Sequence, residues 1–342
     1  LDADGLGTLT PTEVDAGSGD VCGEVSLSLD ITEFDCDQVG TQTVTLTAED
    51  EYGNSSTCTA IVTVEDNVPP QALCQSITVQ LDAAGNASLA AAQIDNGSND
   101  ACPYGPVPGG LDNLSLDITA FGCDAVGQNN VVLTATDVNG NSSTCTAVVT
   151  VEDNVAPQAL CQDVTVQLDG SGAGQLTPEE VNAESEDACG LGDFTLSENV
   201  FDCDDVGTQI VTLTVTDING NTDSCTALIT IEDNVVPTAL CEDVTIQLDT
   251  NGAASLLPDN VDGGSAGACG VSSLVLSEDS FDCSDIGTNL VTLIVIDVNG
   301  NASTCTSTVT VEDNVPPEAL CQDVTVQLDA NGSGSLTAEQ VN

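Results

Sequence analysis

Hydrophobic and polar residues alternate along short stretches of this chain, and turn-forming residues separate the stretches. In 164–169 (VTVQLD), Val and Leu occupy every second position, so one face of the predicted strand is apolar. The stretch 210–217 (IVTLTVTD) alternates in the same way, and we expect Val211, Leu213 and Val215 to point inward. Two further strands are predicted at 194–199 and 224–233.

The segments between these strands carry specific turn and helix signals. The sequence 217–221 (DINGN) contains the Asn-Gly step, which is the strongest short hairpin signal, and it separates two predicted strands. In 176–181 (LTPEEV), Thr177 suits an N-cap, Pro178 suits the first helical position, and Glu180 completes a capping box. One short helical turn is therefore predicted there.

The cysteines reveal an internal repeat. Cognate cysteines such as Cys189 and Cys269 recur with a period of about 80 residues, which is longer than the period of solenoid repeats. Across one copy the step is longer by seven residues, which lie between Cys102 and Cys123 in a Pro/Gly-rich stretch and indicate a surface loop. The four cognate series are Cys22, Cys102, Cys189 and Cys269; Cys36, Cys123, Cys203 and Cys283; Cys58, Cys145, Cys225 and Cys305; and Cys74, Cys161, Cys241 and Cys321.

Module boundaries follow a recurrent acidic sequence that ends in proline. VEDNVPP at 64–70 recurs with small changes, and proline ends the strand before it. Short strands with one apolar face predict immunoglobulin-like β-sandwiches of about 80 residues, stacked into an elongated rod. Because aromatic residues are few, we expect aliphatic cores. The predicted modules are 1–67 (incomplete), 68–154 (with the insertion), 155–234, 235–314, and the start of another at 315–342.

The ends of the chain fall inside the repeat. The chain begins in mid-motif at Leu1 without a signal peptide, so we expect an interior segment of a longer chain or a processed product. Residues 328–342 occupy the same repeat phase as 1–15. If the tail of one chain completed the first module of the next, these two segments would compete for one place. This argues against donor-strand assembly in its simplest form.

The charge balance excludes several functions. The chain has 56 acidic residues and no Lys, Arg or His. We therefore expect no binding to nucleic acid and no direct membrane insertion. Most general-base and phosphate-binding chemistry is also missing, so we expect no enzyme. Adjacent carboxylates such as Glu179 and Glu180, or Asp204 and Asp205, point apart and do not suggest a glycosidase.

Sixteen cysteines in such a chain indicate disulfides and an extracellular, cell-surface location. Four cysteines per module allow three pairings. We expect one disulfide between the opening and closing strands and another across a short loop. The first kind is 74–145, 161–225 and 241–305, and the second is 22–36, 102–123, 189–203 and 269–283. Cys58 and Cys321 remain, with partners in neighbouring sequence or in another chain.

The combined motifs resemble a known family. VEDNVPPQALC, then VTVQLD, then GTQxVTLTxxDxxGNxxxC is similar to the hyalin-repeat (HYR) module, an immunoglobulin-like domain. Tandem, acidic, cysteine-rich versions resemble those in giant surface proteins of Bacteroidota, including gliding-type adhesins. The resemblance covers the whole chain and implies adhesion or a stalk without catalysis. The chain departs from animal hyalin repeats in its extra cysteine pair and its lack of Trp.

The acidic linkers are candidate Ca²⁺ sites, because hard cations prefer carboxylate and carbonyl oxygens. VEDN also resembles the Ca²⁺-binding linkers of cadherins. The alternative is that Asp and Asn only end strands and shape turns. An EF-hand-like stretch at 2–13 is interpreted as a turn, because a strand enters its copies. The candidate ligands are Asp66, Asn67, Asp153, Asn154, Asp233, Asn234, Asp313 and Asn314 in linkers, and Asp137, Asn139, Asp217, Asn219, Asp297 and Asn299 in hairpins.

Two functional hypotheses remain at this point. The first is a structural fibre or adhesin stalk, whose partners are neighbouring modules or copies of the same fibre. The second is a repeated weak binding module for a glycan or protein ligand, acting by avidity; spacer domains of a large secreted enzyme are a third reading. Thr-rich faces such as Thr212, Thr214 and Thr216 could bind such a ligand. Asn-x-Ser sequons stand at Asn54, Asn86, Asn141 and Asn301.

Overall fold

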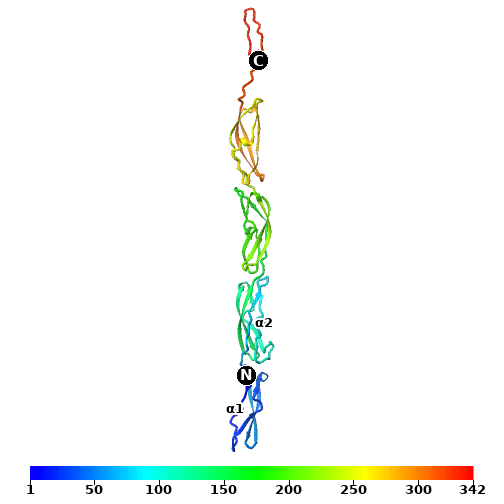
Figure 1. Cartoon of the computed structure of the whole chain (residues 1–342), viewed down its shortest axis with the longest axis vertical. Coiled ribbons are helices and arrows are strands. Elements are labelled where there is room, and N and C mark those ends of the chain that lie inside the picture. The colour runs from blue at the N-terminus through cyan, green and yellow to red at the C-terminus, as the bar shows by residue number, and fades with distance from the viewer. Residues whose placement is uncertain (342) are drawn as a thin grey trace. The chain divides into compact units, whose positions relative to one another are not determined.

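The computed structural model describes residues 1–341 and is all-β, as the sequence predicted (Figure 1). Its contacts divide the chain into two compact units. The first unit comprises Leu1–Ala159, Ser185–Asp193 and Thr214–Ser224, and the second comprises Leu160–Glu184, Phe194–Leu213 and Cys225–Asn342.

The second module shows the repeated architecture. A four-stranded sheet has the order β6-β11-β10-β8, and a two-stranded sheet pairs β7 with β9. Strands β10 and β11 form the antiparallel hairpin predicted by the Asn-Gly step, while β6 runs parallel to β11. The elements are β6 (Ile77–Gln80), β7 (Ala87–Ser88), α2 (Ala91–Ile94), β8 (Leu111–Leu116), β9 (Ala120–Phe121), η2 (Cys123–Ala125), β10 (Gly127–Asp137) and β11 (Ser142–Glu152).

The core of this module lies between its two sheets, which makes the module a small β-sandwich. Leu133 of β10 and Val149 of β11 are fully buried and pack with Phe121 of β9. The cores are mainly aliphatic, but the expectation from the low aromatic content was incomplete. Each module buries one phenylalanine: Phe34, Phe121, Phe201 and Phe281.

The same elements recur in the other modules. The first contains β1 (Gly7–Thr8), α1 (Pro11–Val14), β2 (Val25–Leu29), β3 (Glu33–Phe34), η1 (Cys36–Gln38), β4 (Gly40–Asp50) and β5 (Ser55–Val64). The third contains β12 (Val164–Gln167), β13 (Gly174–Gln175), α3 (Pro178–Val181), β14 (Leu191–Leu196), β15 (Val200–Phe201), η3 (Cys203–Asp205), β16 (Gly207–Asp217) and β17 (Thr222–Glu232). The fourth contains β18 (Val244–Gln247), β19 (Ala253–Ser255), η4 (Pro258–Asn260), β20 (Val271–Leu276), β21 (Ser280–Asp282), η5 (Cys283–Asp285), β22 (Gly287–Asp297) and β23 (Ala302–Glu312).

The helical turn predicted at 176–181 is confirmed as α3. The Glu180 carboxylate accepts a hydrogen bond from the backbone N–H of Thr177 at 2.8 Å, which is one half of the capping box. The alternating pattern of 210–217 is also confirmed, since Val211, Leu213 and Val215 of β16 are buried. The strand predicted at 194–199 is displaced, because β14 begins at Leu191 and ends at Leu196.

The first module has a smaller sheet than the others. Its strand order is β2-β4-β5, without a strand equivalent to β6. The amino group of Leu1 donates to the carbonyl of Glu65 at 2.7 Å, as Leu81 N–H donates to the carbonyl of Glu152 at 2.9 Å in the second module. Among residues 315–341, the structure contains η6 (Ala338–Gln340) and no strand.

Candidate functional site at the module junctions

Three disulfides join the opening segment of a module to its closing strand. Cys74, which precedes β6, is bonded to Cys145 in β11, and the third and fourth modules repeat this bond. Each bond lies next to the parallel strand pair at one edge of the four-stranded sheet, for example β6 with β11. The pairs Cys74–Cys145, Cys161–Cys225 and Cys241–Cys305 are those expected from the sequence.

The other expected pairing was wrong, because the remaining disulfides join neighbouring modules. The structure forms none of the short-loop pairs 22–36, 102–123, 189–203 and 269–283. It forms Cys36–Cys102, Cys123–Cys189 and Cys203–Cys269, with Cα–Cα distances of 5.3, 5.1 and 5.3 Å. Four cysteines have no disulfide partner among residues 1–341: Cys22, Cys58, Cys283 and Cys321.

The strand inside the expected loop explains the error. Six-residue β8 lies between Cys102 and Cys123, and such a strand is about 20 Å long. A disulfide holds its two Cα atoms within about 7 Å. The intervening strand therefore disfavours a bond between the two cysteines, and each is bonded to a cysteine of an adjoining module instead.

A glycine turn makes room for each junction disulfide. Gly85 has a left-handed φ of 74°, and a Cβ there would lie 2.6 Å from the sulfur of Cys123. The same virtual Cβ would lie 3.4 Å from both Ala188 Cβ and Cys189 Sγ of the next module. Gly172 has φ 79°, and a Cβ added there would lie 2.6 Å from Cys203 Sγ. The Asp-x-x-Gly turn that follows strand β6 or β12 is therefore part of the junction.

The linker aspartate before the second module is held by that module's hairpin tip, 137–141. Asp66 is 6% exposed. Its Oδ2 accepts a hydrogen bond from Asn139 Nδ2 at 3.0 Å, and its backbone carbonyl accepts one from Asn141 Nδ2 at 3.0 Å. Its Oδ1 accepts the backbone N–H of Val68 at 3.2 Å. We call this hydrogen-bonded set the junction clamp.

The junction clamp recurs with nearly the same geometry. Asn219 Nδ2 donates to Asp153 Oδ2 at 2.7 Å, and Asn299 Nδ2 donates to Asp233 Oδ2 at 2.7 Å. Asn221 and Asn301 repeat the bond to the linker carbonyl, at 3.1 and 2.9 Å. Each hairpin tip therefore contacts its linker through one amide-to-carboxylate and one amide-to-carbonyl hydrogen bond. The sequons at Asn141 and Asn301 place their amide nitrogens inside the clamp.

The hairpin aspartates shape their own turns. Asp137 is 1% exposed. Its Oδ1 accepts the backbone N–H groups of Asn139 and Asn141, both at 2.8 Å, and its Oδ2 accepts Asn141 Nδ2 at 2.8 Å. The turns that begin at Asp217 and Asp297 have the same bonds. These carboxylates are occupied by the turn.

The linker asparagines lie apart from the clamp. Asn154 Nδ2 donates to Gln80 Oε1 at 2.6 Å, and Asn67 Nδ2 contacts Glu65 Oε2 at 3.4 Å. Asn234 and Asn314 donate to Gln167 and Gln247 in the same manner as Asn154. Asp313, whose linker is followed by no strand among residues 315–341, is exposed. The structure thus brings Asp66 together with Asn139 but directs Asn67 elsewhere.

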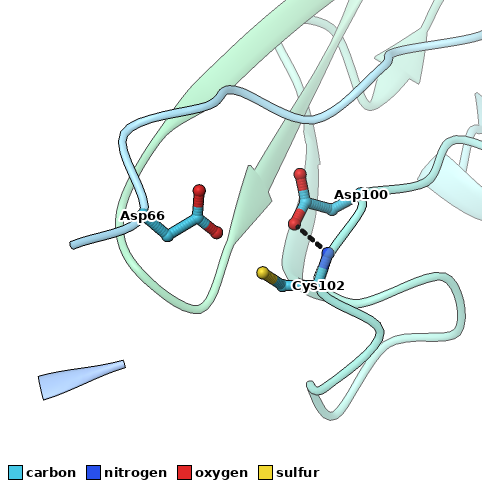
Figure 2. A group of neighbouring side chains, drawn as sticks. All are labelled: Asp66, Asp100 and Cys102. Atoms are coloured by element: carbon cyan, nitrogen blue, oxygen red, sulfur yellow. Dashed lines mark hydrogen bonds between the residues drawn. The ribbon is translucent and has the colours of Figure 1, made fainter. Parts of the chain in front are cut away.

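A second carboxylate, which the sequence reasoning missed, faces the linker aspartate. Figure 2 shows Asp66, Asp100 and the sulfur of Cys102 pointing toward a common space. One oxygen of each carboxylate and the sulfur lie within 4.8 Å of one another, and Asp153, Asp187 and Cys189 form the same group. Asp100 Oδ2 accepts the backbone N–H of Cys102 at 2.9 Å. We call Asp66 with Asp100, and Asp153 with Asp187, the carboxylate pairs.

The fourth module lacks this arrangement. The residue two positions before the junction cysteine is Asp in Asp-Ala-Cys of the second and third modules, but Gly267 stands in the fourth. Asp233 therefore has the clamp of Asn299 but no equivalent of Asp100. An acidic residue two positions before the junction cysteine is the sequence signal that could have identified the pair. It occurs in the modules whose preceding linker aspartate has a carboxylate partner.

The electrostatics of the carboxylate pair oppose ionisation. Burial, together with the negative charges of Asp66 and Asp137, raises the pKa of Asp100 above its usual value. The chain contains no Lys, Arg or His that could neutralise the pair. Two carboxylates whose oxygens lie this close fit a hard cation, which binds oxygens at about 2.3–2.6 Å. The bonded sulfur of Cys102 is not available as a ligand.

Comparison with known proteins places the chain among extracellular repeat proteins. No protein-family model matches it. It is similar to the hyalin of Lytechinus variegatus, with 29% identity over 320 residues, which cover 87% of this chain and 58% of that protein. It is 28% identical to the hyalin of Strongylocentrotus purpuratus over 306 residues, 84% of this chain and 25% of that protein. The chain thus spans less than two thirds of either relative.

Solved structures with detectable likeness include cadherin ectodomains. Domains EC3–6 of protocadherin gammaB7 match with a TM-score of 0.31 and 16% identity, covering 81% of this chain and 86% of that one. Domains EC1–4 of Drosophila N-cadherin match with a TM-score of 0.27 and 12% identity, covering 91% and 97%. No helix among the described residues is long and apolar enough to cross a membrane. The hyalin similarity and the disulfide-bonded sandwiches together identify extracellular, hyalin-repeat-like tandem modules.

Proposed function

We propose that the chain is a structural repeat region of an adhesive extracellular fibre or stalk. The observation that carries this proposal is the disulfide between successive modules, which fixes each module to the next in addition to the backbone linker. A stalk needs such fixation, whereas independent binding modules do not. The gliding-type bacterial setting stays part of the proposal, while the curated relatives are sea-urchin hyalins.

This function needs no catalysis. Without Lys, Arg and His, the chain lacks the side chains that most often activate a nucleophile. At the junctions, the linker carboxylate of Asp66 accepts an amide hydrogen bond and lies close to the second carboxylate of Asp100. Binding of the purified, oxidised chain to glycan arrays and to cell surfaces tests the stalk proposal. The stalk proposal expects the chain itself to bind nothing. Saturable binding that recurs across preparations would replace it with the avidity model.

The carboxylate pairs are proposed structural Ca²⁺ sites. Asp66 with Asp100, and Asp153 with Asp187, would hold the ion, which would neutralise carboxylates that otherwise repel each other. Each pair supplies at most four of the six to eight oxygens that Ca²⁺ takes, so water must supply others. Affinity in the range of extracellular modules, about 10⁻⁴–10⁻³ M, is expected. The clamp asparagines keep the linker carboxylate in place.

Thermal melting of the oxidised chain with Ca²⁺ and then with EDTA tests these sites. The melting temperature of the first compact unit, which contains both carboxylate pairs, should rise with Ca²⁺. This rise should vanish in the double variant Asp100→Asn, Asp187→Asn. Asp20→Asn is the matched control, because Asp20 also accepts the N–H of its own module's cysteine but faces no linker aspartate among the described residues. An equal Ca²⁺ response in the double variant would exclude the pairs as ligands.

A further inference from the structure

The six disulfides overlap along the sequence. Each one closes a loop that contains the first cysteine of the next, so the loops form an unbroken series from Cys36 to Cys305. At every position in this range, at least one disulfide spans the backbone. In order, the bonds are 36–102, 74–145, 123–189, 161–225, 203–269 and 241–305.

These bonds define two covalent routes that use different backbone segments. The first rail alternates junction disulfides with the backbone segments 102–123 and 189–203. The second rail alternates the disulfides within modules with the linker segments 145–161 and 225–241. Every junction between these modules is therefore crossed twice, once by a disulfide and once by backbone.

Of the two central strands of the sheet, one lies outside both rails and the other lies mostly on the second rail. Strand β10 (Gly127–Asp137) lies in the segment 123–145, which only connects one rail to the other. Strand β6 and helix α2 lie in 74–102, which is a second such connection. Strand β10, with buried Val131 and Leu133, therefore belongs to a cross-connection, whereas β11, with buried Val149 and Val151, belongs mostly to the second rail.

We infer that the chain carries tension through these two rails, which limit how far a module can extend even when its hydrophobic core is disrupted. This deepens the stalk function proposed above, on which its physiological meaning rests. A pull along the chain is opposed by covalent bonds once a rail is straight. The sheets then stay folded, or re-form at once, because their strands cannot be drawn far apart.

The magnitude follows from chain lengths. The segment from Cys189 to Cys203 reaches about 50 Å when extended, while a module of about 80 residues without disulfides reaches about 270 Å. A folded module is about 36 Å along its 11-residue strand β16. Since the junction disulfide adds its Cα–Cα distance of 5.3 Å to the extended segment, complete unfolding of an oxidised module lengthens it by about 20 Å, roughly a tenth of the gain for a reduced module.

The insertion changes which rail becomes straight first. In the second module the first rail contains the lengthened segment 102–123, whereas the second rail contains the shorter segment 145–161. Tension there falls first on the second rail. In the third module the segment 189–203 of the first rail is shorter than the segment 225–241 of the second, but over both modules the second rail stays shorter by about three backbone residues, so tension falls first on the second rail.

Single-molecule pulling of the full chain through terminal peptide tags tests this inference. Between Cys36 and Cys305 the shortest oxidised path has about 60 residues of roughly 269, so prior reduction should add about 700 Å of contour length. Oxidised chains that unfold in steps of about 270 Å, the length of a free module, would overturn the inference. This comparison needs no substitution and therefore does not depend on a variant's folding.

Variants that lack one or both of two neighbouring disulfides distinguish a chain with two rails from a chain with one. Removing Cys123–Cys189 alone, or Cys161–Cys225 alone, leaves the other rail and should change the maximal extension by about 10 Å or less. Removing both bonds by serine substitution lengthens the shortest path by about 54 residues, about 180 Å. Large gains in either single-bond variant would contradict the two-rail topology.

Limited digestion with a Glu-specific protease provides an independent measurement. Molecules cut once between Cys36 and Cys305, for example at exposed Glu51, should keep full mass on non-reducing gels and separate only after reduction. Fragments that separate without reduction after one such cut would overturn the rails. Ligand binding on glycan arrays would remove the stalk function but leave these mechanical results unchanged, so the two failures are distinguishable.

Discussion

The junction clamp should be the most sensitive polar element of each module, and Asn219→Ala isolates it. The substitution removes the 2.7 Å hydrogen bond from Asn219 Nδ2 to Asp153 Oδ2. Asp153 is 7% exposed, and the chain has no cationic side chain that could take the place of the amide. A buried carboxylate is therefore left with a missing donor.

The magnitude follows from hydrogen bonds to charged groups, which contribute about 1.5–3 kcal/mol. Since about 1.4 kcal/mol corresponds to a factor of ten, protection of the linker amides should fall roughly 10- to 150-fold. Hydrogen exchange of the oxidised full chain in EDTA measures this at Val155, whose N–H donates to Asp153 Oδ1 at 3.1 Å. The corresponding amides of Val68 and Val235 serve as internal controls within the same molecule.

The control variant is Asn251→Ala. Asn251 Nδ2 donates to Asp249 Oδ2 at 3.2 Å in an exposed turn, so water can replace it, and protection should change less than about threefold. The reasoning is refuted if Asn219→Ala also changes protection less than threefold. It is also refuted if Val68 and Val235 lose protection to the same extent, because the effect would then be global.

Three further variants test separate features. Gly172→Ala should reduce formation of the Cys203–Cys269 bond, measured by thiol counting, because it adds about 1–2 kcal/mol of left-handed backbone strain and a Cβ 2.6 Å from Cys203 Sγ; Gly170→Ala in the same turn meets open space and should form the bond normally. Asp100→Asn in EDTA should raise the melting temperature, because burial and repulsion by Asp66 and Asp137 raise the pKa of Asp100; an unchanged or lower value would contradict this. Hydrogen bonds from Asn54 and Tyr52 lower the pKa of Asp50, so its stabilisation exists above the unfolded pKa and is lost as pH falls through the lower folded pKa; carboxyl NMR titration should show this in the native chain, and Asp50→Asn should remove that part of the acid dependence.

The strand pattern was largely predictable because it depends on local alternation. Strand β16 and its hairpin partner β17 follow from valines and leucines at every second position and from the Asn-Gly step. The parallel pairing of β12 with β17 was not predictable in this way. It joins strands that are far apart in the sequence, and alternation within one strand contains no information about a distant neighbour.

The junction disulfides could not be derived from spacing. Cys189 and Cys203 are close in the sequence, which favoured their pairing, but an intervening strand separates them. The Asp-x-x-Gly turn carried the missing information, since Gly172 lies against Cys203 and Ala268 of the next module. The role of this turn can be recognised only when the structures of both modules are known.

The candidate ligands were predicted in part. The sequence directed attention to linker acids such as Asp66 and to the hairpin tips, and the structure brings these together. It missed Asp100, because that residue lies well beyond the linker in the sequence and belongs to no recognised motif. Asn67 was included because it adjoins Asp66, but successive residues of an extended linker point in different directions.

The disulfide between neighbouring modules also imposes an order in time. Cys123 cannot find its partner until Cys189 has been synthesised and the start of the next sandwich has folded around it. Cys203 waits in the same way for Cys269. For as long as the following module is missing, the module before it holds a thiol without its native partner, and an external oxidant can complete the bond only once both cysteines are present.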